Sequence, residues 1–188
     1  MADEVLTQGL QEWQACCDWL ATGRGIILLR KGGIHERHGG LFEPAHDRFA
    51  LLPTWLHQAP ERLVPGVAAT ITPAPPVGTL PVPAWAQVER IWKATDLERI
   101  QDLGPDLIWT ADEVARRFAY RDEPWLYVLA LRVHRWDQPR SIPDDPAYAG
   151  CRSWIALRTG LALGGSRPVL DDVAFADRLA QIDARLNP

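Results

Sequence analysis

The strongest strand pattern in the chain is the run from Trp125 to Trp136. Its first part, residues 125–131, is apolar at every position. A strand that is apolar on both faces is buried on both faces, so this run predicts the central strand of a sheet. In its second part, Arg132 and His134 are two residues apart, and side chains at that spacing point to the same face of a strand.

Apolar residues at helical spacing predict three helices. The first spans residues 5–22 and ends at Gly23, the second starts near Pro83, and the third starts near Asp171 or Asp172, which are good N-caps. The three apolar stripes consist of Leu6, Leu10, Trp13, Cys17 and Leu20; of Trp85, Val88 and Trp92; and of Phe175, Leu179, Ile182 and Leu186.

Two capping boxes predict two further short helices. They are Thr95-Asp96-Leu97-Glu98 and Thr110-Ala111-Asp112-Glu113. In such a box the threonine hydroxyl and the glutamate carboxylate each accept a hydrogen bond from a free amide of the first turn.

The remaining segments predict the fold class. Short strands are expected at residues 25–30, 49–52, 67–71 and 152–157, and a proline-rich loop at residues 137–150. Residues 72–84 contain five prolines and are expected to form a stiff loop within one domain that spans residues 1–188. Because helices and strands do not alternate regularly, we expect an α+β fold with a mixed or barrel-like sheet and flanking helices.

Composition narrows the functional classes. The chain has 188 residues and a net charge of −4, so it lacks the overall basic field of many nucleic-acid-binding proteins. No apolar run reaches the roughly 20 residues that a membrane span needs, and the N-terminus does not resemble a signal peptide. Three cysteines without framework spacing favour a reducing compartment, so the expected location is the cytoplasm. No metal-ligand pattern is present, and no cofactor is predicted.

Cations and aromatic residues follow the ends of several predicted strands. Arg30 and Lys31 leave a strand and enter a Gly-Gly turn, where exposed amides and cations favour an anion site. The alternative is a solvated polar loop. Further candidates are Arg132, His134, Arg152, Trp154 and Trp55. Positive charge beside aromatic surface is typical of sites for nucleotides or single-stranded nucleic acid.

Histidines offer a second class of site. His57 follows a predicted strand, and His35 and Glu36 lie in the polar segment after Lys31. A histidine beside a carboxylate can act as a general base, so these three residues indicate a possible hydrolase, with or without a metal ion. A hydrogen-bonded structural histidine is the alternative for His57.

Three separated segments resemble the bacterial family DUF1802, a domain of unknown function. The matching stretches are Leu28-Leu29-Arg30-Lys31-Gly32-Gly33-Ile34-His35-Glu36, Leu52-Pro53-Thr54-Trp55-Leu56-His57-Gln58 and Tyr148-Ala149-Gly150-Cys151-Arg152-Ser153-Trp154. Because this family has no established activity, the resemblance implies no catalytic residue.

A fainter similarity is to the ASCH and PUA group of small β-barrels, which bind RNA or modified nucleosides. In that group a helix precedes a Gly-x-Lys-x-x-Glu-x-Arg motif on the first strand. Gly23 and Arg30 match the first and last positions, whereas Gly25 and Leu28 replace the lysine and the glutamate. This departure speaks against the amidohydrolase activity of that group and leaves binding open.

The leading hypothesis is therefore a module that binds RNA, DNA or a nucleotide. A hydrolase acting through His35, His57 and Glu36 is the second hypothesis. A protein-interaction domain that uses exposed tryptophan and the proline-rich loop is the third.

Overall fold

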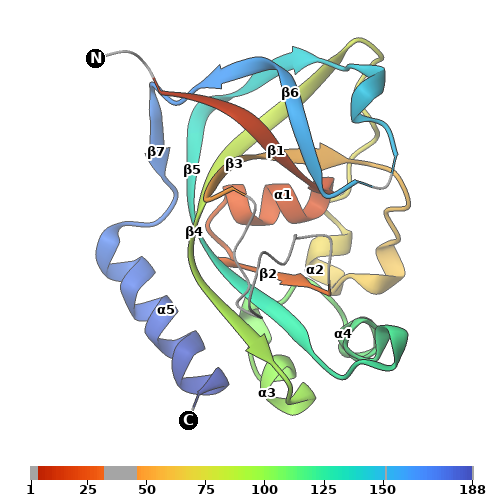
Figure 1. Ribbon diagram of the computed structural model, residues 1–188, viewed down its shortest axis with the longest axis vertical. Helices are drawn as coiled ribbons and strands as arrows, with labels where there is room; N and C mark the ends of the chain where they lie inside the picture. Colours follow the sequence, from red (N-terminus) through yellow and green to blue (C-terminus); the bar gives the residue numbers. More distant parts are fainter. Residues whose placement is uncertain (1–3, 32–45, 151, 188) are drawn as a thin grey trace.

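The computed structural model describes residues 4–31, 46–150 and 152–187 (Figure 1). Its described strands form one seven-stranded sheet in the order β2-β5-β4-β3-β1-β6, with β7 paired to β5. The strands are β1 (Val5–Trp13), β2 (Ile27–Arg30), β3 (Arg48–Thr54), β4 (Thr79–Ala94), β5 (Leu126–Pro143), β6 (Trp154–Ala162) and β7 (Ser166–Pro168). The pair β1–β3 is parallel and the other pairs are antiparallel, so the predicted α+β fold with a mixed sheet is confirmed, although the sheet is not closed.

Helices flank this sheet. They are α1 (Gln14–Ala21), α2 (Pro65–Ala68), α3 (Leu97–Gln101), α4 (Ala111–Phe118) and α5 (Asp172–Leu186), with 3-10 turns η1 (Pro60–Arg62), η2 (Gly104–Asp106), η3 (Tyr120–Asp122) and η4 (Pro146–Tyr148). Helix α5 begins as predicted, because the carboxylate of Asp171 accepts a hydrogen bond from the amide of Ala174 at 2.8 Å. Its stripe buries Phe175 and Ile182.

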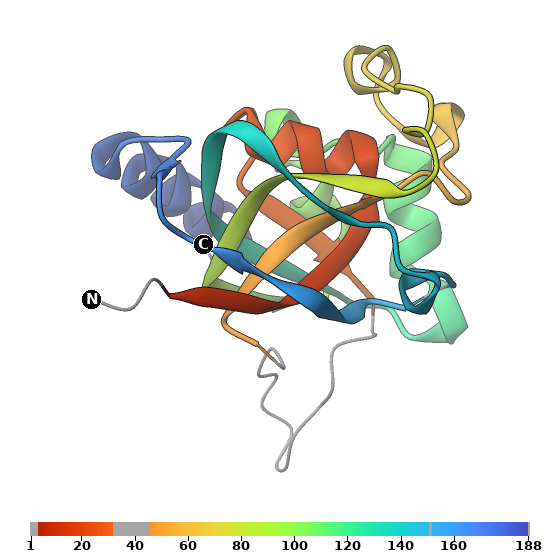
Figure 2. The ribbon, with the colours of Figure 1, turned by 90° about the horizontal axis from the view of Figure 1, so that it is seen from above.

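The long antiparallel pair of β4 and β5 forms the middle of the sheet. Its register runs from Thr79 opposite Pro143 to Ala94 opposite Leu126, with shifts at two points that disrupt the regular ladder. Bulges of this kind increase strand bending and twist, and Figure 2 shows both strands curving around α1. Strand β5 is central, between β2 and β4, as the apolar run at residues 125–131 predicts.

Two clusters of buried side chains pack against this curved sheet. The larger cluster joins α1, α3, α4 and α5 to β2 and β5 and contains the fully buried Leu20, Ile100 and Leu129. The smaller cluster joins β3 and β6 to the first residues of β4 and the last residues of β5, and it contains Trp85 and Trp136. The site described below lies at an edge of the larger cluster.

Both short capped helices are confirmed. At α4 the hydroxyl of Thr110 accepts a hydrogen bond from the amide of Glu113 at 3.3 Å. At α3, however, Asp96 rather than Thr95 is the cap, since its carboxylate accepts from the amides of Glu98 and Arg99. An ionised carboxylate is a stronger hydrogen-bond acceptor for amides than a hydroxyl, which explains why Asp96 rather than Thr95 is the N-cap.

The prediction of one helix over residues 5–22 is half wrong. Residues 5–13 form β1, and only residues 14–21 are helical. Strand β1 lies between β3 and β6, where its buried residues contribute to the sheet rather than to a helix face. Tertiary pairing therefore overrides the helical spacing of Leu6, Leu10 and Trp13.

Three further predictions of local structure are wrong. Residues 65–68 form the short helix α2, where a strand was expected at 67–71. The helix expected from Pro83 is instead the middle of β4. The two proline-rich loops are shorter than expected, because residues 79–84 lie in β4 and residues 137–143 lie in β5. The prolines are tolerated because they lie near the end of the β4–β5 pair at which Thr79 is opposite Pro143.

Candidate functional site

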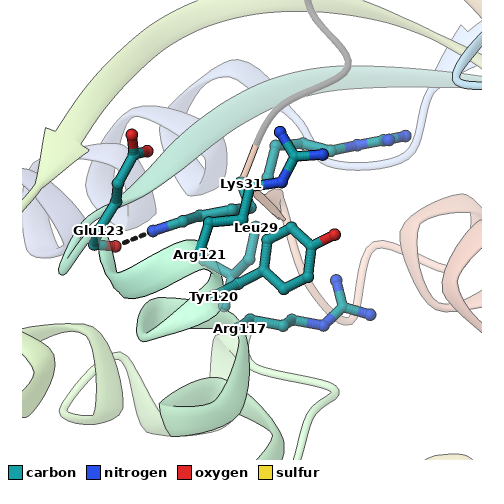
Figure 3. A pocket seen from close by; sticks show the side chains of 7 residues that line it. Leu29, Lys31, Arg117, Tyr120, Arg121 and Glu123 are labelled. Atoms are coloured by element: carbon teal, nitrogen blue, oxygen red, sulfur yellow. Dashed lines mark hydrogen bonds between the residues drawn. The ribbon is translucent and has the colours of Figure 1, made fainter.

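A cleft of about 340 Å³ lies where the end of β2 meets α4 and η3. Figure 3 shows the side chains that line it, which are Leu29, Arg30, Lys31, Arg117, Tyr120, Arg121 and Glu123. Four of these seven residues are cations and one is an acid, so the cleft carries positive charge in a protein whose net charge is negative. We refer to this hollow as the cationic cleft.

A second hollow of about 240 Å³ adjoins the cationic cleft, because Arg30 and Arg117 line both. Its other walls come from β1, from the end of β3 and from Gly150, and they include Glu12 and His57. The two hollows therefore share a wall that contains the two arginines.

Arg30 holds three segments together at this point. Its guanidinium lies 2.5 Å from the carboxylate of Glu12 and donates to the Ser153 hydroxyl at 3.1 Å and to the Gln11 carbonyl at 3.2 Å. The side chain is only 13% exposed. Arg30 thus fixes β2 against β1 and against the start of β6, and most of its charge is compensated within the protein.

Lys31 clamps the turn that follows α4. Its ammonium donates to the carbonyls of Phe118 at 2.8 Å, Trp125 at 2.7 Å and Glu123, the last drawn as a dashed line in Figure 3. The same ammonium lies 4.5 Å from the centre of the Trp125 ring. Loss of hydration lowers the pKa of Lys31, partly offset by the nearby charge of Glu123.

Arg117 reaches the cleft from the last turn of α4. Its Nε donates to the buried carboxylate of Glu113 at 2.8 Å, and its guanidinium carbon lies 3.7 Å from the centre of the Trp109 ring. These contacts fix the side chain, which is still 25% exposed. Arg117 therefore offers a positioned cation with part of its surface open to a ligand.

The rim at η3 presents the most accessible groups. Arg121 and Asp122 have positive φ angles of 62° and 58°, which residues other than glycine adopt rarely and at a cost. Tyr120 is 51% exposed, and the guanidinium of Arg121 lies 5.3 Å from the centre of its ring. Among the described residues, Arg121 forms no ion pair. The turn thus exposes an uncompensated cation beside an aromatic ring.

Two predicted residues lie far along the sheet from this cleft. In the β2–β5 register Arg30 is opposite Tyr127, whereas Arg132 and His134 lie further along β5. Arg132 lies 2.6 Å from Asp172 and stacks on Phe175, so it joins α5 to the sheet.

His134 stacks on Trp85 with ring centres 4.1 Å apart. Burial and the charges of Arg132 and Arg48 lower the pKa of His134. The ring is therefore uncharged at neutral pH, which suits its stacked position.

The other predicted binding residues are divided between surface and core. Arg152 is exposed beside Ser153, the partner of Arg30. Trp154 packs edge-on against Phe49 at 5.1 Å between ring centres, and its ring nitrogen is buried. Trp55 lies at a different hollow, where its N–H donates to the carbonyl of Thr72 at 2.9 Å.

Of the proposed hydrolytic residues, only His57 can be placed. It lines the hollow beside the cationic cleft and has a positive φ of 58°. His35 and Glu36 lie outside the described residues. Within residues 4–31, 46–150 and 152–187, no group of three or more His, Cys, Asp or Glu side chains is arranged to hold a metal ion.

Sequence reasoning missed Arg117, Tyr120 and Arg121. A signal was present, because the run Arg116-Arg117-Phe118-Ala119-Tyr120-Arg121 begins three residues after the last residue of the second capping box. Cations clustered at the end of a predicted helix, with a tyrosine among them, could have been added to the candidates from Arg30 and Lys31.

A comparison with protein families decides what the chain is related to. The model of the domain of unknown function DUF1802 matches residues 9–181. The chain belongs to the DUF1802 family. No curated protein shows significant sequence similarity to it. In the part of the DUF1802 chain that the structure describes, no helix has both the length and the apolar character needed to cross a membrane.

Three solved structures are similar to this DUF1802 protein. The crystal structure of ASCH from Zymomonas mobilis is 15% identical, with a TM-score of 0.46 and coverage of 93% of both chains. A single-residue mutant of that protein is 17% identical, with a TM-score of 0.46 and coverage of 80% of this chain and 89% of the other. Likeness at this level transfers no ligand or activity.

Proposed function

We propose that this DUF1802 protein binds nucleic acid or nucleotides in the cationic cleft. The observation that carries the proposal is the meeting of Lys31, Arg117 and Arg121 with the exposed ring of Tyr120 in one hollow. Phosphate needs cations, and a base needs a flat aromatic or guanidinium surface.

The contacts of each cation suggest a division of roles. Arg121 has no ion pair among the described residues, so it can contact a phosphate without first losing a partner. Tyr120 offers its exposed face to a base. Arg117 and Lys31 are held by internal bonds and add a fixed positive field in the wall of the cleft. Arg30 is the least available, because Glu12 and Ser153 already occupy its guanidinium.

Arg121→Gln and Tyr120→Ala are both expected to weaken binding of a fluorescent single-stranded oligonucleotide. Loss of one base–aromatic stack costs about 1–3 kcal/mol, which is roughly 5- to 150-fold in affinity for Tyr120→Ala. Loss of one phosphate contact should reduce the slope of log K against log salt by about one for Arg121→Gln. Fluorescence anisotropy at several salt concentrations, with RNA and DNA probes, measures both effects.

Arg135→Gln is the matched control. It removes the same charge from another exposed arginine that lines a different hollow, so it should leave the affinity and the salt slope close to those of the wild type. Absence of binding to any RNA, DNA or mononucleotide at low salt would refute the proposal. Equal losses of affinity in the Arg121 and Arg135 variants would mean that nucleic acid binds outside the cationic cleft.

A hydrolytic function is a second candidate, and the position of His57 favours it. His57 lines the hollow that shares Arg30 and Arg117 with the cationic cleft, so a bound strand could pass close to its imidazole. If the protein cleaves RNA or DNA, His57→Ala should abolish cleavage and leave affinity within about twofold, since a general base contributes to rate rather than to ground-state binding. Cleavage that persists in this variant would exclude His57 as the base.

A further inference from the structure

A hollow with tryptophan in its wall lies at a fork in the sheet, and none of its described lining residues lines the cationic cleft. Strands β3 and β4 pair only between residues 48–50 and 85–87. Beyond this point β3 continues beside β1, and the first residues of β4 continue beside the end of β5. A hollow of about 490 Å³ opens between the two branches, lined from β3 by Pro53 and Thr54 and from β4 by Leu80. We call it the fork pocket.

The walls of the fork pocket are mainly apolar. Trp55 and Leu56 line one side, and Val77 and Leu80 line another. Leu56 is 51% exposed and Val77 99% exposed, although few large apolar side chains of the described residues are in open solvent. In Figure 2, the segment around α2 projects beyond the sheet at this end. A hollow of this volume with exposed apolar walls has the size and character of a small-molecule site.

Hydrogen bonds hold both aromatic residues of the pocket in place. The N–H of Trp55 donates to the Thr72 carbonyl at 2.9 Å. The hydroxyl of Tyr148 accepts from the amide of Arg158 at 2.8 Å, and the Tyr148 carbonyl accepts from the side chain of Gln11 at 3.1 Å. The pocket is thus formed in advance, and a ligand would not have to order these groups.

The charge of the fork pocket is opposite to that of the cationic cleft. Asp144 and Asp145 line it, and no Lys, Arg or His is among its described lining residues. Asp145 already caps η4 and lies 3.6 Å from Arg158. Asp144 is exposed and forms no ion pair within the described chain, so its carboxylate is free for a ligand.

From this combination we infer that the fork pocket binds a small organic cation: an amine or ammonium group on an aliphatic body. The aliphatic part would lie against Leu56, Val77 and Leu80. The positive charge would lie between the carboxylate of Asp144 and the electron-rich face of Trp55, which are the two groups that attract cations here. None of its described lining residues lines the cationic cleft, although Gln11, Thr54 and Leu56 also line the hollow that contains His57, and the inference does not rest on the proposed nucleic-acid site.

Titration with n-butylammonium, against pentanoate as an anion with the same alkyl chain, tests the inference. The indole N–H resonance of Trp55, assigned by its loss in Trp55→Phe, should shift in a saturable way with butylammonium and stay unchanged with pentanoate. Asp144→Asn should weaken the binding by up to about fivefold, which is the effect of removing one exposed ion pair. Asp144→Glu, which keeps the negative charge, should bind butylammonium about as tightly as the wild type does.

Asp102→Asn is the control, because Asp102 is exposed at the end of α3 and also lacks an ion pair in the described chain. It should bind butylammonium as the wild type does, and so should Arg121→Gln. Equal binding of pentanoate, an unmoved Trp55 resonance, or unchanged affinity in a folded Asp144→Asn protein would each overturn the inference. None of these outcomes depends on whether the cationic cleft binds nucleic acid.

Discussion

Replacing Gly25 with alanine is expected to destabilise the protein by about 2–3 kcal/mol, the cost of forcing extra volume into a well-packed site. A Cβ atom on Gly25 would overlap Nε1 of Trp19 and lie 2.7 Å from its Cδ1, closer than real Cβ atoms approach their neighbours. The guanidinium of Arg24 lies over the ring at 4.4 Å from its centre, and the ring N–H is buried, so displacement of the ring would break these contacts. Relief therefore requires a shift of the Trp19 ring, of α1 or of the start of β2.

Gly66→Ala is the matched control for this substitution. Nothing lies within 4 Å of a Cβ atom at Gly66, and the residue is in the short helix α2. Alanine there should be neutral or stabilise by up to about 1 kcal/mol, since it restricts the unfolded chain. Urea unfolding followed by tryptophan fluorescence compares both variants with the wild type.

A second substitution tests the cause of the Gly25 effect. Trp19→Ala in the Gly25→Ala background removes the ring atoms that the new Cβ would meet. The double variant should be more stable than the sum of the two single effects predicts, because the overlap is relieved only when both changes are present. Strict additivity would show that the cost at Gly25 arises from something other than this contact.

The sequence predicts those elements whose evidence is local. Thr110 and Asp171 begin α4 and α5 because each cap bonds an amide within three residues of itself. Strand β5 is predictable because residues 125–131 are apolar whichever face is considered. Such signals do not depend on what the element packs against.

Strand β4 is misread because bulges change its side-chain period. Buried residues alternate at Leu80, Val82 and Ala84, as in a strand. The register with β5, however, shifts between residues 82 and 84 and again between residues 88 and 90. These shifts leave Trp85 and Trp92 at a spacing that matches a helix face. A pattern method cannot see a bulge, since the extra residue is accommodated only by pairing with β5.

The candidate site depends on register in the same way. Arg30 and Lys31 follow β2 and could be recognised from the strand and the glycines after it. Whether Arg132 joins them depends on which residue of β5 lies opposite Arg30, and that residue is Tyr127. Arg117 and Tyr120 lie beside Lys31 because α4 and the turn after it pack against the end of β2, where Lys31 bonds the carbonyls of Phe118 and Trp125. No local pattern contains that contact.

Glu113→Gln is expected to destabilise the protein by about 2–3 kcal/mol, through loss of a buried ionic network. The Glu113 side chain is 3% exposed and accepts from Nε of Arg116 at 2.7 Å and from Nε of Arg117 at 2.8 Å. The effect should be smaller than the roughly 3–5 kcal/mol of a fully buried pair, because Arg116 is 55% exposed and can return to water. Glu98→Gln, at an exposed acid in the first turn of α3, is the matched control and should change stability by less than about 0.5 kcal/mol.

The pH dependence of the unfolding free energy tests whether the charge of Glu113 causes this loss of stability. Burial alone would raise the pKa of Glu113, but hydrogen bonds from Arg116 and Arg117 outweigh burial and hold the pKa below its ordinary value. The unfolded chain therefore binds this proton more readily than the folded protein does. The contribution of Glu113 to stability is complete above about pH 5 and decreases as the pH falls through the lowered pKa.

Unfolding free energies of wild type and Glu113→Gln, measured from pH 7 down to pH 3, should therefore converge towards the acid end. Taking the difference between the two proteins removes the opposite trend of Asp106, whose pKa burial raises despite the nearby charge of Arg178. The expected result is a gap that is constant from pH 7 to about pH 5 and closes below it. A gap that stays constant to pH 3 would mean that Glu113 stabilises α4 through packing alone, and that the position of Arg117 in the cationic cleft does not depend on an ionised partner.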